Sequence, residues 1–442
     1  MASIILGMGF GLCSVSQAQM DGMGGMGGMG GGSGGIGGIP GASFESATDP
    51  SAVRMTGGFR VLPTITVGQR YDSNVFLVPK APGLERDDFV TVANPQVRGL
   101  YAGDLVSVNS RVGATGQYFA KHNGLNNVAA NGGIYVDASK LISQRWPGVR
   151  FTVDDLYVFT PEPPAFLTGS LDTEEVNPLS RGFQASRVNT HSNAVSVNLG
   201  VPLSLTVDLT ARYSNYFTHF GESQVQQTGT LLDTMFHRYV VGLSKRISEQ
   251  DIVSSSFLGS YASSNNAQSF MTSGGLVGWE HRFNEKMFLR STAGVQQVND
   301  RSGSGTSNVA PSGSLSVWWN DTWTSWRLAY NVSLTPSLQF VGRPILTHAV
   351  SFTVIQRTYI PNLVVFVGLN YGRGNELGGG SSSTTGVSFT SYNASGGMSY
   401  KVTPKTFVVL TYNYLKYDNG FGQQRFELDR NIAQLVLTQA FY

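Results

Sequence analysis

Strict alternation of apolar and polar residues marks the segment from residue 201 to 217. One parity, from Leu203 to Tyr213, is apolar or aromatic throughout, and the other, from Ser204 to Ser214, is polar or charged. Successive side chains of a β-strand point to opposite faces, so this segment is predicted to be a strand with one apolar and one polar face. Its alternation runs for about twice the 5–6 residues of an ordinary strand. That length is close to the roughly 9–11 residues of a strand that crosses a bilayer.

Segments of the same kind follow one another from residue 58 to the C-terminus. Residues 326–335 and 363–371 show the same alternation. Turn signals divide the region into about eighteen strand-length pieces of roughly 11–16 residues, and bacterial single-chain barrels have an even number of strands. One piece breaks the pattern, because the adjacent Asp154 and Asp155 put a carboxylate on each face. This suggests a bulge or a pair near the rim.

The connections between these pieces alternate between short and long. The short ones contain Gly, Pro, Asn or Asp and lie near residues 103, 147, 202, 250, 285, 321, 361 and 404. The long ones are 72–87, 120–127, 160–190, 218–233, 263–269, 298–307, 339–344, 374–385 and 418–427. Such alternation is expected when one end of a barrel faces the periplasm and the other faces the outside. We predict an all-β fold: a membrane-spanning antiparallel up-and-down β-barrel of about 18 strands over residues 58–442, in the outer membrane of a Gram-negative bacterium.

Composition agrees with this class of protein. Charged residues make up only 13% of the chain, and the formal net charge of +2 gives no reason to expect a nucleic-acid partner. No run of about 18 apolar residues follows the N-terminal segment, so no transmembrane helix is expected. The alternative class is a secreted all-β protein.

The first 57 residues are expected to lie outside the barrel. Residues 1–18 resemble a signal peptide, although they lack a basic start, which a misplaced start codon would explain. Residues 19–57 form a Gly/Met-rich segment, predicted to be a disordered periplasmic leader. Cys13 is the one cysteine, so no disulfide is expected. Methionines recur at every third position from Met20 to Met29. They are either incidental to the repeat or ligands of Cu(I). We predict no metal and no cofactor.

Aromatic residues mark two further places. Trp318, Trp319, Trp323 and Trp326 surround the turn near residue 321, where a periplasmic aromatic girdle is expected. The chain ends in Phe441 and Tyr442, which resembles the C-terminal signal that the barrel assembly machinery reads. In the usual pattern the terminal aromatic faces lipid. Here the parity of Phe441 is the more apolar one, so the register of the last strand stays open.

The start of the predicted barrel carries a family resemblance. Residues 58–76 form an alternating strand that ends in the motif Tyr71-Asp72-Ser-Asn74-Val-Phe76. This motif resembles the opening of the β-barrel porin 2 family. The resemblance implies an outer-membrane barrel. Some such proteins resemble the large barrels that are paired with polysaccharide-export proteins, so a periplasmic polysaccharide-export partner is one implied possibility.

Barrels of this size leave an aqueous channel unless loops fill it. If the apolar parity faces lipid, the inward rows include the predicted lumen residues Arg111, Asp208, Arg212, Arg238, Arg290, Arg327 and Arg357. Arginine at the lipid midplane costs about 2–4 kcal/mol, so these charges belong inside. They form either a solvated, partly ion-paired wall or a positive field that favours anionic solutes or an acidic polysaccharide. The long loop at 160–189 either constricts this space or stands outside it.

Motifs of common enzyme classes are missing. The chain has no phosphate-binding loop with lysine, no His-Glu-x-x-His and no Gly-x-Ser-x-Gly. The one cluster to consider, His219 near Glu222 and Ser223, is accounted for by a solvated loop. We therefore predict no catalytic residues and a passive conduit for hydrophilic solutes or a secreted, anionic polysaccharide. The alternative is a non-conducting surface or structural barrel with a plugged lumen. The expected partners are outer-membrane lipids and the barrel assembly machinery.

Overall fold

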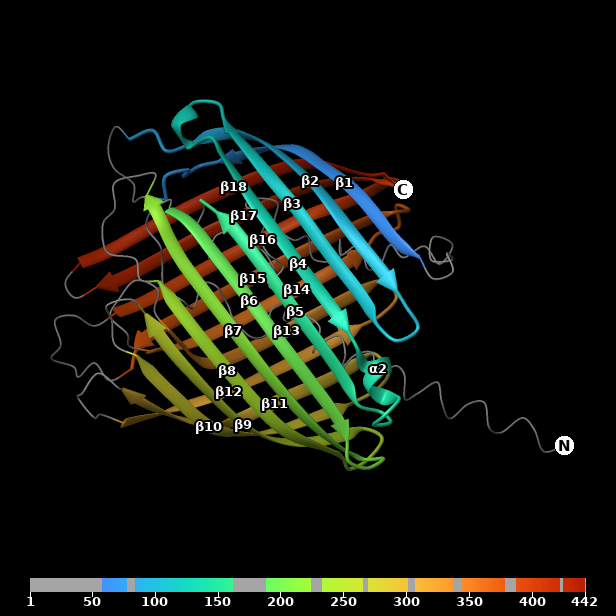
Figure 1. The fold of residues 1–442 in the computed structure, drawn as a ribbon. Coiled ribbons are helices and arrows are strands. Elements are labelled where there is room, and N and C mark those ends of the chain that lie inside the picture. The colour runs from blue at the N-terminus through green and yellow to red at the C-terminus, as the bar shows by residue number, and fades with distance from the viewer. Residues whose placement is uncertain are drawn as a thin grey trace.

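Eighteen strands form one continuous antiparallel sheet (Figure 1). The computed structural model describes residues 58–77, 84–161, 188–223, 233–264, 269–300, 307–336, 344–377, 387–421 and 424–441. The first nine strands are β1 (Phe59–Asp72), β2 (Asp88–Ala102), β3 (Ser107–Phe119), β4 (Asn127–Asp137), β5 (Arg150–Thr160), β6 (Val188–Pro202), β7 (Val207–Ser223), β8 (Thr234–Arg246) and β9 (Asp251–Ser264). The other nine are β10 (Phe270–Arg282), β11 (Met287–Asp300), β12 (Ser307–Asn320), β13 (Thr324–Pro336), β14 (Pro344–Arg357), β15 (Leu363–Glu376), β16 (Val387–Thr403), β17 (Thr406–Phe421) and β18 (Gln424–Ala440).

The sheet closes on itself. Each strand pairs with the strands before and after it in the chain, and β1 also pairs with β18, where Thr64 lies opposite Ala440. Closure leaves no strand edge, so the backbone groups of the spanning segments are satisfied without water. The predicted all-β, up-and-down barrel and its strand number are confirmed.

The two faces of each strand differ as the sequence pattern predicts. On β7, Tyr213 is 42% exposed whereas its neighbour Ser214 is 2% exposed. Large apolar side chains such as Val112, Val277 and Leu410 are likewise exposed on the outer face of their strands. A closed barrel with an apolar outer band is the form in which β-strands span a membrane. The chain has the fold of an outer-membrane β-barrel.

The short connections gather at one end of the barrel, where β1 begins and β18 ends (Figure 1). Two of them differ from their predictions. The turn predicted near residue 202 lies at 203–206, so Leu203 and Leu205 precede β7 instead of belonging to it. The β4–β5 connection contains a short helix, α2 (Ser139–Ser143), before Gly148, whose φ of 80° is readily adopted only by glycine. At the other end, the predicted loop 418–427 is shorter, because β17 continues to Phe421 and β18 starts at Gln424. The 3-10 helix η2 (Asn123–Leu125) lies between β3 and β4.

The suspected bulge at Asp154 and Asp155 is absent. Both residues pair in unbroken register with β6, Asp154 with Ser196 and Asp155 with Val195. The Asp155 carboxylate, on the outer face, accepts a hydrogen bond of 2.8 Å from the Asn193 side-chain amide. A cross-strand partner, and not a bulge, therefore accommodates the outward charge.

Neither helix among the described residues is long and apolar enough to cross a membrane.

Candidate functional site

The candidate site has two parts, the inner wall of the barrel and the mouth at the long-loop end. The predicted lumen residues all lie on the strand face opposite the exposed apolar row. In the register, Arg111 pairs with Gly133, Asp208 with Ser244, Arg212 with Val240, Arg238 with Ser214, Arg290 with Glu280, Arg327 with Trp318 and Arg357 with Val364. That these residues line a conducting path remains a prediction.

Two arginines of the inner wall share an aromatic platform. The Cζ atoms of Arg290 and Arg327 lie 5.8 and 5.1 Å from the ring centroid of Trp318. Trp318 in turn stacks on Phe288, with ring centroids 4.5 Å apart and an angle of 9° between the rings. A guanidinium is attracted to an indole face, so the platform orients both charges. Trp318 thus faces inward, which corrects the prediction that it belongs to the girdle.

Acidic residues accompany some of these arginines. Arg290 donates from Nε (2.9 Å) and Nη2 (2.6 Å) to Oε2 of Glu280. Asp154 interacts electrostatically with Arg111 and Arg212. The wall is therefore partly ion-paired, as one of the two sequence interpretations expects.

The mouth begins with a buried ion pair across the seam between the first and last strands. Asp72 on β1 and Arg430 on β18 are 0% and 1% exposed. Arg430 Nε donates to Asp72 Oδ1 over 2.9 Å, and its Nη2 donates to Oδ2. Arg70 lies 3.9 Å from the same carboxylate and donates to Gln117 Oε1 over 3.3 Å. Asp72 therefore joins the two strands whose pairing closes the barrel.

The segment after β1 is fastened to the barrel by polar contacts. Asn74 donates from its backbone to Asp72 Oδ1 (3.1 Å) and from its side chain to the Asp429 carbonyl (3.1 Å). The Val75 amide donates to the Arg86 carbonyl over 2.7 Å, and Arg86 forms an ion pair of 3.5 Å with Asp429. Both described ends of the β1–β2 connection are therefore bound to β18.

Apolar packing adds to these contacts. Val75 is fully buried in a cluster with Val90, Val92, Phe119 and Leu125. On β2 and β3 these residues have the inward parity, so the connection packs against the inner side of the wall. The family-like motif is thus divided. Asp72 and Asn74 anchor by hydrogen bonds, Phe76 packs on the apolar cluster, and Tyr71 packs against Phe89 at 5.3 Å.

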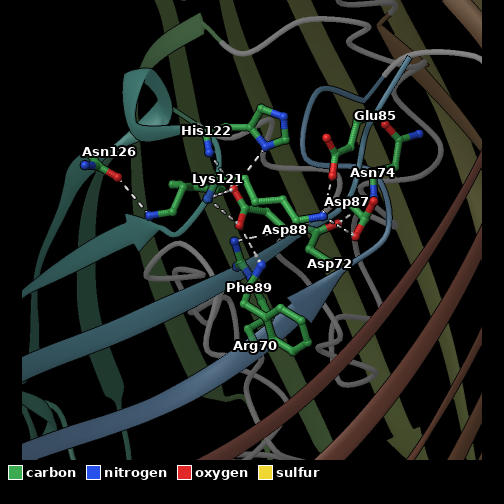
Figure 2. Close-up of polar contacts among 11 residues, drawn as sticks. Arg70, Asp72, Asn74, Glu85, Asp87, Asp88, Phe89, Lys121, His122 and Asn126 are labelled. Atoms are coloured by element: carbon green, nitrogen blue, oxygen red, sulfur yellow. Dashed lines mark hydrogen bonds and ion pairs between the residues drawn. The ribbon is translucent and has the colours of Figure 1, made fainter. Parts of the chain in front are cut away.

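A second connection is tied to the first at the mouth (Figure 2). The Asp88 carboxylate accepts hydrogen bonds from the backbone amides of Lys121 (3.0 Å) and His122 (2.9 Å) and contacts His122 Nδ1 at 3.0 Å. The Lys121 ammonium reaches Glu85 and, at 3.2 Å, Asp87. Hydrogen bonds to these two carboxylates raise the pKa of Lys121. We call the set Arg70, Asp72, Asn74, Glu85, Arg86, Asp87, Asp88, Lys121, His122, Asp429 and Arg430 the mouth network.

The last strand resolves the register that the sequence left open. Phe441 is 55% exposed and shares the outer face with Leu435 and Leu437, whereas Val436 and Ala440 are buried on the inner face. The more apolar parity faces outward. Tyr442 lies outside the described residues, as do the predicted signal peptide and leader and residues 162–187 of the longest loop.

The remaining cluster from the sequence consists of His219, Glu222 and Ser223, of which the structure describes the side chain of His219. His219 Nδ1 lies 2.7 Å from Asp233 Oδ2, and its ring stacks on Phe217 on the outer face. The side chains of Glu222 and Ser223 lie outside the described part. Among the described residues, no group of three His, Cys, Asp or Glu side chains could hold a metal ion.

Comparisons with known proteins give a distant likeness. No protein-family model and no curated protein matches the chain. Among solved structures, OccAB2 of Acinetobacter baumannii is 13% identical, with a TM-score of 0.45 over 87% of this chain and 98% of its own. OccK2 (OpdF) of Pseudomonas aeruginosa is 9% identical, with a TM-score of 0.44 over 86% and 98%. The outer membrane protein opdK of Pseudomonas aeruginosa is 11% identical, with a TM-score of 0.43 over 86% and 99%. Membership of the β-barrel porin 2 family stays a prediction.

Proposed function

We propose that the barrel is a passive outer-membrane channel for small hydrophilic solutes, and that arginines of its inner wall favour anions. The observation that carries the proposal is a closed barrel of eighteen strands with polar and basic residues on its inner face. Barrels of 16–18 strands are wide enough to leave an aqueous path. The proposal is transport without catalysis.

The preference for anions rests on the arginines near the short-turn end. Arg290 on β11 and Arg327 on β13 flank Trp318 of β12, and both guanidinium groups lie near its ring, while Glu280 pairs with Arg290. On the other side of the wall, one carboxylate, Asp154, interacts with both Arg111 and Arg212. The predicted lumen residues are six arginines and one aspartate, and Glu280 and Asp154 on the same face raise the number of carboxylates to three. A wall with such an excess raises the local concentration of anions.

The mouth network bears on access to the channel. It holds the described parts of the β1–β2 connection against the inner wall, where Val75 and Leu77 are fully buried. The connection therefore occupies part of the long-loop entrance on the side of β1 to β3. Small solutes fit such an entrance better than a polymer does, and no described contact favours the path of a polysaccharide.

Liposome swelling tests the proposal. Proteoliposomes with the purified barrel should swell in isotonic gluconate faster than in an uncharged sugar of similar size. Arg327→Gln should reduce the ratio of the two rates by roughly twofold or more, because one fixed charge of the wall is lost. Arg373→Gln, which removes an arginine from the outer face, is the matched control and should leave the ratio unchanged. Equal rates for gluconate and the sugar in the wild type would refute the anion preference.

A further inference from the structure

The outer face carries a polar cluster near the long-loop ends of β13, β14 and β15. The Tyr330 hydroxyl lies 2.9 Å from His348 Nδ1, and the two rings stack with centroids 6.3 Å apart. Arg373 on β15 lies directly opposite His348 in the register. Tyr330 is exposed on the outer face. Val350, two residues from His348, and Tyr371, two residues from Arg373, are exposed on the same face. The cluster therefore faces the lipid and not the channel.

Its height along the barrel follows from the register of β14 and β15. Moving toward the long-loop end, the outward pairs are Phe352 with Leu369, Val350 with Tyr371, and then His348 with Arg373. Toward that end the outward row of β15 changes from Leu369 to Tyr371, Arg373 and Asn375, and tyrosines mark the membrane interface of such barrels. Lipid-facing arginine costs about 2–4 kcal/mol at the midplane but only about 0–1 near the interface. The register therefore puts Arg373 in the layer of lipid head groups.

The chemistry of the three side chains matches a phosphate group. A guanidinium presents a planar fork of donors that fits phosphate oxygens, and its charge is permanent. When the Tyr330 hydroxyl donates to His348 Nδ1, the ring proton lies on Nε2, which becomes a second donor. The other register neighbour of Arg373 is Thr390, so neither neighbour is acidic.

We propose that Tyr330, His348 and Arg373 bind a phosphate of the phosphorylated glycolipid that forms the outer leaflet of the outer membrane. The long-loop end of a barrel faces that leaflet, and its head groups are anionic. The Tyr330 hydroxyl orients the imidazole, and Arg373 supplies the charge. This site is on the lipid side of the wall and does not depend on the proposed channel function.

Two similar pairs elsewhere show what distinguishes this site. Tyr157 and His191, and Tyr213 and His237, make the same hydroxyl-to-Nδ1 contact at 2.7 and 2.8 Å. On the far side of each pair, His191 lies opposite His219, and His237 lies opposite Tyr261. Of the three pairs, the one with Tyr330 alone has an arginine opposite its histidine.

Native mass spectrometry of the full-length barrel in detergent tests the site. The probe is doubly phosphorylated lipid A, titrated against the wild type and compared with the same lipid after enzymatic removal of its phosphates. The wild type should bind the phosphorylated lipid more tightly. Arg373→Gln should weaken that binding roughly tenfold, since one charged hydrogen-bond donor is lost. Arg373→Lys keeps the charge but loses the planar fork, so its affinity should lie between those of the wild type and Arg373→Gln.

Two controls show whether the loss of binding belongs to this site. Arg327→Gln removes a positive charge from the inner wall and should leave lipid binding unchanged; a heat-modifiable band on a gel confirms that each variant is folded. Equal affinity of Arg373→Gln and the wild type, or of the two forms of the lipid, would overturn the proposal. So would inorganic phosphate competing as well as lipid A, which would indicate a free-anion site, or a dimer that Arg373→Gln dissociates, which would indicate a protein partner on this face.

Discussion

At the scale of single residues, the pair between Asp72 and Arg430 connects the beginning of the barrel with its end. The two side chains are buried and hydrogen-bonded through both carboxylate oxygens. Removing one member of a buried ion pair leaves the other charge uncompensated, which typically costs about 3–5 kcal/mol. The position of the pair at the β1–β18 seam means that this cost falls on closure of the barrel.

We predict that Asp72→Asn lowers the free energy of unfolding by about 3 kcal/mol or more. The measurement is urea unfolding of the refolded barrel in lipid vesicles, followed by tryptophan fluorescence. The double variant Asp72→Leu with Arg430→Met removes both charges of the pair but leaves the buried Arg70, so it should recover only part of the loss. If Asp72→Asn is as stable as the wild type, the pair has no part in closure.

Sequence patterns could predict which face of a strand a residue occupies, but not its partners across the barrel. The parity that places Arg327 inward is local, since each neighbour in the strand contributes to it. Trp318 has an aromatic neighbour, Trp319, on the opposite face, so its own direction was not evident. Arg430 lies 358 residues from Asp72 in the chain. No local spacing could join those two.

At the scale of elements, the ion pairs of Lys121 join the β3–β4 connection to the β1–β2 connection. Glu85 and Asp87 raise its pKa above the ordinary value of 10.5. A raised pKa means that the contact stabilises the folded mouth fully at a pH below 10.5 and that this stabilisation is lost as the pH rises through the higher folded value.

We therefore expect Lys121→Gln to increase the mobility of the mouth at neutral pH and to behave like the wild type in strong alkali. A fluorophore attached through Gly124→Cys in a Cys13→Ser background reports this mobility as anisotropy; a side chain at Gly124 meets open space. The difference in anisotropy between the two proteins should be constant from neutral pH to about pH 9 and vanish well above 10.5. A difference that is already absent at pH 7 would show that these ion pairs do not hold the connection.

The elements themselves were largely predictable because alternation and turn residues are local signals. The deviations occur where other interactions decide. The helix α2 replaces a tight turn, since its signal spans only Ser139–Ser143. The extension of β17 and β18 past a polar, glycine-containing segment depends on their pairing with each other over their full length, from Thr406 opposite Gln439 to Phe421 opposite Gln424. Neither deviation alters the order or direction of the strands.

At the scale of the whole molecule, the central claim is that the closed barrel contains an aqueous path with a positive wall. Strand number and closure follow from the fold, whereas conduction is the property that separates a channel from a barrel with a plugged lumen. Ion selectivity distinguishes a wall with an excess of arginines from a wall in which acidic residues balance the arginines.

Single-channel recording in planar bilayers, with the reversal potential measured across a salt gradient, tests that claim most directly. We predict discrete conductance steps and a reversal potential on the anion-selective side. Arg327→Gln together with Arg212→Gln should shift the reversal potential toward zero without loss of the folded barrel. A folded wild-type barrel that does not conduct, or that prefers cations, would contradict the account.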